Sequence, residues 1–304
     1  MNFQNTIASP VSISGKGLHT GQQVTVTLEP APADFGIQFM RIDLPGNPVV
    51  KAIPENVFDT SRGTAIKDGE AEVHTIEHLM AALAGLSLDN VLVKMMGAET
   101  PILDGSSRVY VELIKEVGLK ELDTPRHYAT VNEEITFSIP EQQVELTIRP
   151  ADHFKMTVNV DYGTKVLAQQ QAVLNNLEDF YPDVYNCRTF VFLNELQFLI
   201  HNNLIRGGDV DNAIVFVDTI PEKSVLKELA LFFNKKDIKV TANHILNNIT
   251  MRHNNEPARH KLLDLIGDLY LLGFPLQAEI VANRPGHFAN TSFAKKIKEK
   301  MIIL

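Results

Sequence analysis

Two stretches of the sequence nearly repeat each other: GQQVTVTLEP at residues 21–30 and QQVELTIRP at residues 142–150. In both, polar and apolar residues alternate, as they do in strands with one buried face, and both end at a proline. Each stretch is followed shortly by alanine, aspartate and phenylalanine, in that order. The repeat indicates that the chain contains two copies of one structural unit.

The segments downstream of the two stretches are also similar. Residues 75–86 and 257–272 each have the periodicity of an amphipathic helix, and apolar extended segments follow at 90–93 and 278–282. A further helix is expected at 109–117. These patterns predict an α+β fold, a duplicated α/β sandwich in which two similar domains, each a sheet layered with helices, pack face to face.

The boundary between the two units is expected near a proline. Residues 120–126 contain Asp123-Thr124-Pro125, and a residue before proline disfavours the helical conformation, so this segment is expected to be a linker. We therefore expect a first domain at 1–122 and a second at 127–304. The second half has an additional segment around 169–208, with a helical pattern at 193–203, that the first half lacks.

Composition limits the classes of function. The 304 residues include 28 basic and 37 acidic side chains, and the net charge of −9 argues against broad binding to nucleic acid or to anionic membranes. Cys187 is the single cysteine, which excludes a disulfide framework and fits a reducing compartment. The N-terminus lacks the pattern of a signal peptide, and no apolar run approaches the roughly 20 residues that cross a bilayer. We expect a cytoplasmic protein without stable membrane insertion.

Histidines and carboxylates occur at helical spacing in both predicted helices. HTIEH at 74–78 matches the H-x-x-E-H pattern, in which two histidines hold zinc and the glutamate is a general base. His260, Asp264 and Asp268 follow one another at intervals of one turn, so they share a helix face. A solvated helix surface is the alternative for both sets. Because each set lies in the first turns of the corresponding helix, a pseudo-twofold axis is expected to bring the two sets together.

A third candidate lies near the C-terminus. The stretch NRPGH at 283–287 places His287 after a Pro-Gly turn, just past a predicted strand. Catalytic groups often lie on loops of this kind at the end of a sheet. A surface turn is the alternative interpretation.

Together, these residues resemble the zinc-dependent UDP-3-O-acyl-N-acetylglucosamine deacetylases, which commit the lipid A pathway of Gram-negative bacteria. The resemblance extends over nearly the whole chain, in the family's order. The matching stretches are GLHTG (17–21), EHL (77–79), AAL (81–83), DN (89–90), DGS (104–106), RTF (188–190), RHK (259–261), D (264), GD (267–268) and GH (286–287).

The resemblance implies a metal site between the two domains. Its ligands are His78, His260 and Asp264, the ion is zinc or alternatively ferrous iron, and a water takes the fourth position. Family members carry varied residues at the position of His74, so the resemblance implies that His74 is not a ligand.

The resemblance also implies the catalytic roles of an amide hydrolase. Glu77 is expected to accept the proton of the attacking water. Thr189 is expected to stabilise the oxyanion together with the metal. His287, kept cationic by Asp268, is expected to protonate the departing amine.

For the substrate, UDP-3-O-acyl-N-acetylglucosamine, the resemblance assigns Lys261 and Phe190 to the sugar and nucleotide. It also places Leu18 and His19 among the substrate-binding residues. The additional segment corresponds to the family's passage for the acyl chain, which is expected to be lined by Leu196, Ile205 and Ala213. Residues 161–167 depart from the family's usual pattern, so nucleotide contacts there stay open.

The stretch NEPARHK at 255–261 is similar to the Bacteroidetes branch, whose members often continue into a fused hydroxyacyl-carrier-protein dehydratase. The chain ends at Leu304, so we expect a stand-alone member or a fusion cut at the boundary, a monomer, and no dehydratase activity. Two other interpretations are a zinc peptidase built on His74, Glu77 and His78, and a non-enzymatic acyl-nucleotide-binding protein.

Overall fold

Two five-stranded sheets of identical topology form the framework of the computed structural model, which describes residues 2–246 and 249–304. In each sheet the central strand is antiparallel to a hairpin strand on one side and parallel to its neighbour on the other. The predicted duplication and the α+β class are confirmed. In spatial order, the strands are β2 (Val11–Lys16), β3 (Gln23–Pro30), β9 (Val91–Met96), β4 (Ile37–Arg41) and β5 (Val49–Lys51) in the first sheet, and β12 (Ile135–Ile139), β13 (Val144–Pro150), β18 (Ala278–Asn283), β14 (Lys155–Val160) and β15 (Gln170–Leu174) in the second.

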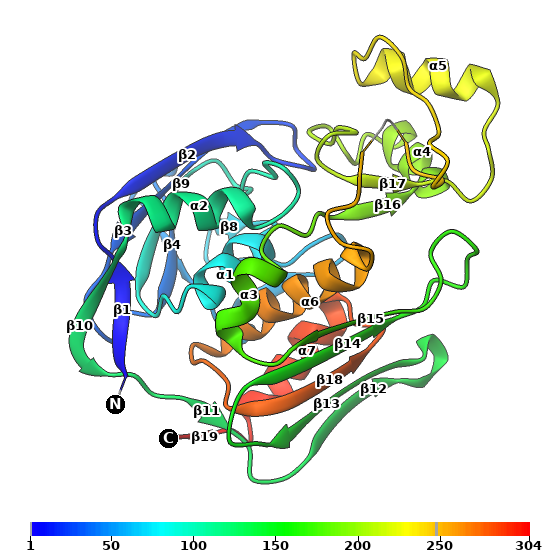
Figure 1. Cartoon of the computed structure of the whole chain (residues 1–304). Helices are drawn as coiled ribbons and strands as arrows, with labels where there is room; N and C mark the ends of the chain where they lie inside the picture. Colours follow the sequence, from blue (N-terminus) through cyan, green and yellow to red (C-terminus); the bar gives the residue numbers. More distant parts are fainter. Residues whose placement is uncertain (1, 247–248) are drawn as a thin grey trace.

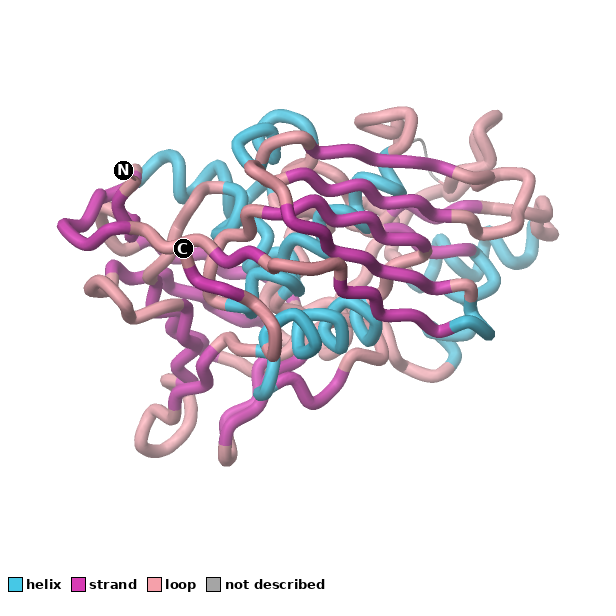
Figure 2. The backbone as a smooth tube through the Cα atoms, turned by 90° about the horizontal axis from the view of Figure 1, so that it is seen from below, coloured by secondary structure: helices cyan, strands magenta, loops and turns pink. Residues whose placement is uncertain are grey.

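The two stretches that repeat in the sequence become equivalent strands, β3 and β13. Their alternating apolar side chains are buried, as one-sided strands require. The buried face of each sheet is covered by a pair of helices from the same half of the chain. Figure 2 shows helices behind the strands of the second sheet. The helices are α1 (Glu77–Gly85) and α2 (Arg108–Val117) in the first half, and α6 (Glu256–Leu269) and α7 (His287–Lys298) in the second. The buried strand residues are Val24, Val26 and Leu28 in β3, and Val144, Leu146 and Ile148 in β13.

Helices α1 and α6 pack against each other between the two sheets (Figure 1). Gly267 of α6 faces α1 so closely that a Cβ at this position would overlap the carbonyl oxygen of Glu77. The helices therefore meet backbone to backbone, and the first turn of α1 lies beside the middle of α6.

Each half carries an insert between the last strand of its sheet and the helix at the centre of the molecule. The first insert contains η1 (Pro54–Asn56), β6 (Val57–Asp59), β7 (Ala65–Asp68) and β8 (Ala71–Val73). The second is larger and has its own apolar core. It contains η3 (Leu177–Asp179), α3 (Phe180–Asp183), β16 (Phe190–Phe192), α4 (Leu193–His201), β17 (Ile214–Phe216) and α5 (Lys223–Phe232).

The structure corrects the expected bounds of the second insert. It begins after β15, because residues 170–174 pair with β14 as the edge of the sheet. It extends past residue 208 as far as α6, through β17 and α5. The helix predicted at 193–203 is confirmed as α4. The first half does not lack an insert; it has a shorter one at the equivalent point.

The expected linker is also corrected. Residues 119–125 form β10 (Leu119–Pro125), which pairs antiparallel with β1 (Phe3–Ile7). Pro125 is the last residue of this strand, a position where proline interrupts no central ladder. The division into domains 1–122 and 127–304 therefore stays a prediction.

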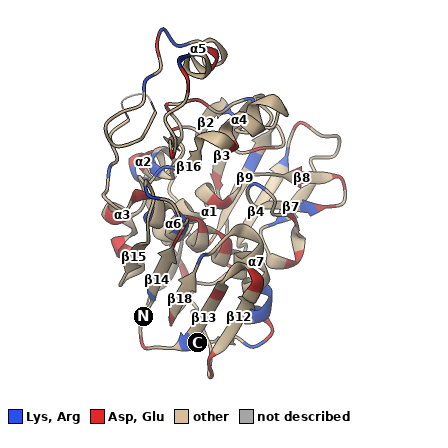
Figure 3. Ribbon diagram, turned by 90° about the vertical axis from the view of Figure 1, so that its right-hand side faces the viewer, with Lys and Arg blue, Asp and Glu red and all other residues tan. Residues whose placement is uncertain are grey.

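Short elements complete the chain: β11 (Ala129–Thr130) pairs with β19 (Ile302–Ile303), and η2 (Pro140–Gln142) and η4 (Tyr270–Leu272) are single turns. Basic and acidic segments are interspersed in the view of Figure 3. Within the described residues, none of the helices combines the length and the apolar character needed to cross a bilayer.

Candidate metal centre and active site

Three potential metal ligands meet where α1 packs against α6. His78 lies in the first turn of α1, and His260 and Asp264 lie one turn apart on α6. The Oδ1 atom of Asp264 is 3.6 Å from Nε2 of His78 and 3.4 Å from Nε2 of His260. All three side chains are buried, and one ligand atom from each lies within 4.8 Å of the others. The expected meeting of the two helices at a shared site is confirmed.

The chemistry of these side chains fits a divalent cation. Among the described residues, Asp264 Oδ1 has no hydrogen-bond partner although it is fully buried, which is costly for a carboxylate oxygen. Nδ1 of His260 lies 3.1 Å from the carbonyl oxygen of Cys187, so Nε2 faces Asp264. Burial lowers the pKa of His260 to about 4, which keeps its imidazole neutral, as a ligand must be. Two imidazoles and one carboxylate form a set that suits zinc or ferrous iron.

The electrostatics of Asp264 support the same conclusion. Burial acts to raise the pKa of Asp264, but His260 and Lys261 hold it well below its usual range, so the carboxylate is ionised. Lys261 Nζ lies 2.9 Å from Asp264 Oδ2. The other carboxylate oxygen, Oδ1, stays available between the two imidazoles.

Glu77 is the first residue of α1 and lies beside the three ligands. Its Oε2 accepts a hydrogen bond of 2.9 Å from the backbone N–H of Thr64. Gly63 passes so close, at a positive φ of 157°, that a Cβ there would lie 2.9 Å from Glu77 Oε1. Burial raises the pKa of Glu77, although His287 and His78 oppose this effect. A carboxylate whose pKa is raised is better able to accept a proton.

His287 lies opposite, at the start of α7, and not in a loop as the Pro-Gly turn predicts. Its Nδ1 is 3.0 Å from Oδ2 of Asp268, and its Nε2 is 3.9 Å from Oδ2 of Asp264. Burial disfavours the charged imidazole, but Asp268, with help from Glu77 and Asp264, raises the pKa of His287 to about 9. The side chain is therefore a cation that can donate a proton from Nε2.

Asp268 is itself held in place by two residues that sequence reasoning missed. Asn290 donates a hydrogen bond of 2.8 Å to Oδ2, and the Thr64 hydroxyl donates one to Oδ1. Asn290 follows His287 at a spacing of three residues on the same helix, so helical periodicity is a signal that could have found it. Thr64 comes from the first insert, and no local pattern links it to Asp268.

A cavity of about 260 Å³ opens over this site, between the two inserts. The structure brings most of the predicted residues together in its wall. Asp268 lies behind His287 and not in the wall. The predicted site residues that line the cavity are Leu18, His19, Glu77, His78, Thr189, Phe190, Ile205, Ala213, His260, Lys261, Asp264 and His287.

Leu196 does not line the cavity, contrary to the expectation. It is buried in the core of the second insert, near Val210 and Leu229. Glu195 and Leu199 of the same helix line the cavity in its place. The reason is helical geometry: Glu195 and Leu199 are four positions apart and share a helix face, whereas Leu196 is adjacent to Glu195 and points into the core of the insert.

His74 lies outside the ligand cluster, in agreement with the resemblance. Its ring packs edge to face against Phe58, and its Nε2 is 3.6 Å from a carboxylate oxygen of Glu72. A peptidase site that uses His74 and His78 together is therefore not supported by the geometry.

Two further contacts hold loops that match the family pattern, at residues 17–21 and 104–106. Glu99 accepts hydrogen bonds from the backbone N–H groups of His19 and Thr20, at 2.9 and 3.0 Å, and so fixes the glycine-rich loop at 17–21. The backbone N–H of Thr189 donates a 2.7 Å hydrogen bond to the carbonyl of Gly105, in the turn at 104–106. Sequence reasoning missed Glu99 because it is distant in the chain from the loop that it holds.

The second insert is fixed to α6 by a buried ion pair. Glu256, at the start of α6, accepts hydrogen bonds from the side chain and backbone of Arg188 at 2.9 and 3.0 Å. Its other oxygen accepts one from the backbone of Arg252 at 2.6 Å. Both ends of the segment that includes Thr189 and Phe190 are therefore anchored at the helix that carries two of the metal ligands.

Comparison with known proteins decides the family. The model of the family "UDP-3-O-acyl N-acetylglycosamine deacetylase" matches residues 4–236 and 234–299. The chain belongs to this family. A "UDP-3-O-acyl-N-acetylglucosamine deacetylase" of Chlamydia pneumoniae is 36% identical over 301 residues, which cover 98% of this chain and 98% of that protein.

Two further relatives of this deacetylase-family chain are longer proteins. The "Bifunctional enzyme LpxC/FabZ" of Chlorobaculum tepidum is 42% identical over 97% of this chain and 64% of the relative. The protein of the same name from Porphyromonas gingivalis is 42% identical over 99% of this chain and 65% of the relative. The chain thus spans slightly less than two thirds of the length of these bifunctional relatives.

Proposed function

We propose that the chain is a metal-dependent amide hydrolase that removes the N-acetyl group of UDP-3-O-acyl-N-acetylglucosamine, a step of lipid A biosynthesis. The observation that carries this proposal is the buried set of His78, His260 and Asp264, with Glu77 and His287 beside it in one cavity. The names of the relatives support the substrate.

Zinc is the proposed ion, and ferrous iron is the alternative that the same ligands accept. When bound, the ion supplies a Lewis acid that lowers the pKa of water to roughly 7 and polarises the amide carbonyl. Three protein ligands leave a coordination position for this chemistry.

The protein side chains divide the proton transfers between them. Glu77 accepts a proton from the attacking water, and its hydrogen bond from Thr64 keeps the carboxylate oriented. The Thr189 hydroxyl donates a hydrogen bond to the oxyanion that develops on the acetyl carbonyl. His287 donates its Nε2 proton to the departing amine, and Asp268 holds Nδ1 protonated on the other side of the ring.

The cavity wall has a cationic side and an apolar side, which we assign to different parts of the substrate. Lys261, whose Nζ lies 5.9 Å from the ring centre of Phe190, supplies a cation on the side proposed for the sugar and nucleotide. Ile205 and Ala213, together with Leu199, form the apolar side proposed for the acyl chain. Leu18 and His19 also line the cavity, and Leu18 packs against the apolar cluster that contains Ile205.

We further propose that the protein works in the cytoplasm as a monomer. The single buried cysteine is suited to a reducing compartment, and the substrate is a nucleotide sugar. The bifunctional relatives make a longer protein with a fused dehydratase part an alternative context for this chain.

The deciding experiment is a deacetylation assay on UDP-3-O-acyl-N-acetylglucosamine with zinc-loaded protein. Acetate release is expected, with loss of activity after chelation and recovery after zinc is added back. Glu77→Ala is expected to retain zinc and to lose about 10²-fold or more in kcat. A zinc-loaded, folded protein that releases no acetate would contradict the proposal, as would full activity in the chelated protein.

A further inference from the structure

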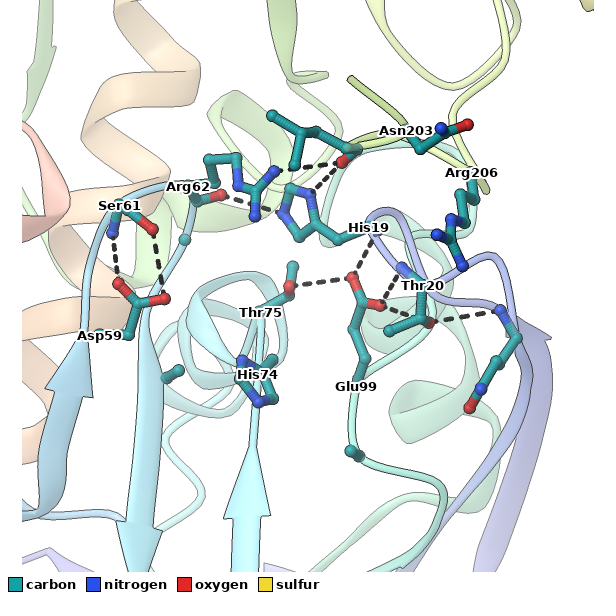
Figure 4. A pocket seen from close by; sticks show the side chains of 15 residues that line it. His19, Thr20, Asp59, Ser61, Arg62, His74, Thr75, Glu99, Asn203 and Arg206 are labelled. Atoms are coloured by element: carbon teal, nitrogen blue, oxygen red, sulfur yellow. Dashed lines mark hydrogen bonds between the residues drawn. The ribbon is translucent and has the colours of Figure 1, made fainter. Parts of the chain in front are cut away.

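A second cavity, of about 400 Å³, lies next to the catalytic one (Figure 4). The two cavities share four wall residues: His19, Ser61, Arg62 and Thr75. Gly63, which lines the second cavity, is the residue whose backbone passes against Glu77. The second cavity, called here the side cavity, is therefore separated from the catalytic carboxylate by a single layer of residues.

The side cavity carries two arginines that have no ion-pair partner. Within the described part of the chain, neither Arg62 nor Arg206 forms a salt bridge, and Figure 4 shows them on either side of His19. Glu99, in the same wall, is occupied by hydrogen bonds from the 17–21 loop. Asp59 is occupied by hydrogen bonds from Ser61. Arg62 Nη1 donates a 3.4 Å hydrogen bond to the carbonyl oxygen of Leu204. The other donors of Arg62, together with the guanidinium of Arg206, can bind an anion, and arginine is suited to carboxylates.

We propose that the side cavity receives the acetate ion produced by deacetylation and lets it leave while the amine product is still bound. This inference rests on the proposed function. In the reaction the bond between the acetyl carbon and the nitrogen breaks, and the oxygen of water forms a new bond to that carbon. The nitrogen takes a proton and stays on the sugar, and the acetyl group becomes a carboxylate.

The walls favour acetate over the diphosphate of the substrate as the anion. Lys261 and Phe190, proposed for the nucleotide side, line the catalytic cavity but not the side cavity. Ile205 and Ala213, proposed for the acyl chain, are also absent from the side-cavity wall. Substrate placed on those two sides therefore leaves the side cavity unfilled, and its volume of about 400 Å³ is ample for an ion of four heavy atoms.

The order of product release tests this route, and sodium acetate is the probe. Acetate that leaves first also rebinds to the enzyme that still holds the amine product, so added acetate lowers kcat. Acetate that leaves last competes only with substrate, so added acetate raises KM and leaves kcat unchanged. The measurement is steady-state deacetylation by the zinc-loaded protein at constant ionic strength.

Substitutions in the wall of the side cavity test whether acetate leaves through it. Ala98→Trp fills the side cavity from a wall position outside the catalytic cavity, and Gln22→Trp does the same if Ala98→Trp does not fold. Arg206→Gln removes one of the two cations. Lys120→Gln removes an exposed cation on β10, away from both cavities, and is the matched control.

Acetate is expected to lower kcat in the unchanged protein and in Lys120→Gln, and to act as a purely competitive inhibitor of the cavity-filling tryptophan variant. In Arg206→Gln, the acetate concentration that halves kcat is expected to rise about tenfold, because a charge-assisted hydrogen bond is lost.

Competitive inhibition of the unchanged protein, no inhibition at all, or the same pattern in the tryptophan variant would overturn the route. An Arg206→Gln variant with a raised KM for substrate and unchanged acetate inhibition would assign the cations to the diphosphate, and would also overturn it. A zinc-loaded protein that releases no acetate contradicts the proposed function itself, which is a different result from all of these.

Discussion

His260 shows how a single residue is prepared for metal binding. One ring nitrogen is held at the Cys187 carbonyl, so the other faces Asp264. Replacing His260 with alanine is expected to abolish stoichiometric zinc and activity together, because two protein ligands then remain. His74→Ala is the matched control and is expected to keep both. Elemental analysis of the purified variants checks this, and full zinc in His260→Ala would rule out the ligand set.

The pH dependence of activity is expected to follow His287 and Glu77. The pKa of His287 is raised from its ordinary 6.5 to about 9, so the required proton is present at neutral pH and is lost as the pH rises through about 9. Glu77 must be unprotonated, and its pKa is raised, so activity is lost as the pH falls. The profile of kcat/KM against pH is expected to be bell-shaped, with both limbs macroscopic.

The substitution Asp268→Asn is expected to affect the basic and acidic limbs of the pH profile differently. The substitution removes the carboxylate that stabilises the imidazolium, so the basic limb is expected to move to lower pH while the acidic limb changes less. His287→Ala is expected to retain zinc. A basic limb at the same pH in Asp268→Asn and in the unchanged protein would show that another group sets it.

Much of the site can be predicted from sequence because its residues obey helical periodicity. His260 and Asp264 are one turn apart, and the resemblance supplies the roles that spacing leaves open. Thr64 and Glu99 could not be predicted, because each contacts residues that only the folded chain brings near. The resemblance assigned Leu196 to the acyl passage, but a resemblance alone does not determine which side chains of α4 face the cavity and which face the core of the insert.

At the level of elements, the crossing of α1 and α6 sets the positions of the ligands. Gly267→Ala places a Cβ against the Glu77 carbonyl, so the helices must move apart. Overpacking of this kind costs about 1–3 kcal/mol and outweighs the roughly 1 kcal/mol gained in helix propensity. Zinc affinity and melting temperature are both expected to fall. Gly286→Ala, where a Cβ meets open space, is the stability control, and equal melting temperatures for the two variants would contradict the close crossing.

The second insert is expected to set chain-length preference through Ala213. A tryptophan at this position fills the apolar side of the catalytic cavity, so Ala213→Trp is expected to raise KM for a long-chain substrate far more than for a short-chain analogue. Steady-state kinetics with the two substrates make the comparison within one variant. Equal increases in KM would show that Ala213 does not meet the acyl chain.

The repeated strands and the paired helices were predictable because each has a clear local period. The strand β10 was not, because its partner β1 is more than 100 residues away, and a terminal proline resembles a linker signal. The end of the second insert was also placed wrongly, because β17 is only three residues long and the helical pattern of α5 does not show which part of the fold it belongs to.

For the whole molecule, resistance to proteolysis is expected to differ between the expected linker and the second insert. Residues 119–125 are paired with β1, and Arg126 forms a 2.8 Å ion pair with Asp89. In contrast, α5 stands away from both sheets in Figure 1, and Leu229 is its only fully buried residue among those described.

Limited trypsin digestion is therefore expected to cut first between residues 223 and 239, where exposed lysines occur, and to spare Lys120 and Arg126. Mass spectrometry of the first fragments checks the order. Initial cleavage at Lys120 or Arg126 would mean that β10 opens more readily than α5.

The two inserts leave their sheets at equivalent points, one between β5 and α1 and the other between β15 and α6. Since α1 and α6 share the metal centre, both inserts end beside the same reacting groups. One contributes Ser61 and Arg62, the other Thr189 and Phe190. As a result of the duplication, two separate inserts border a single active site. Each insert can change in length or sequence independently, while the two sheets and their helices hold the reacting groups in place.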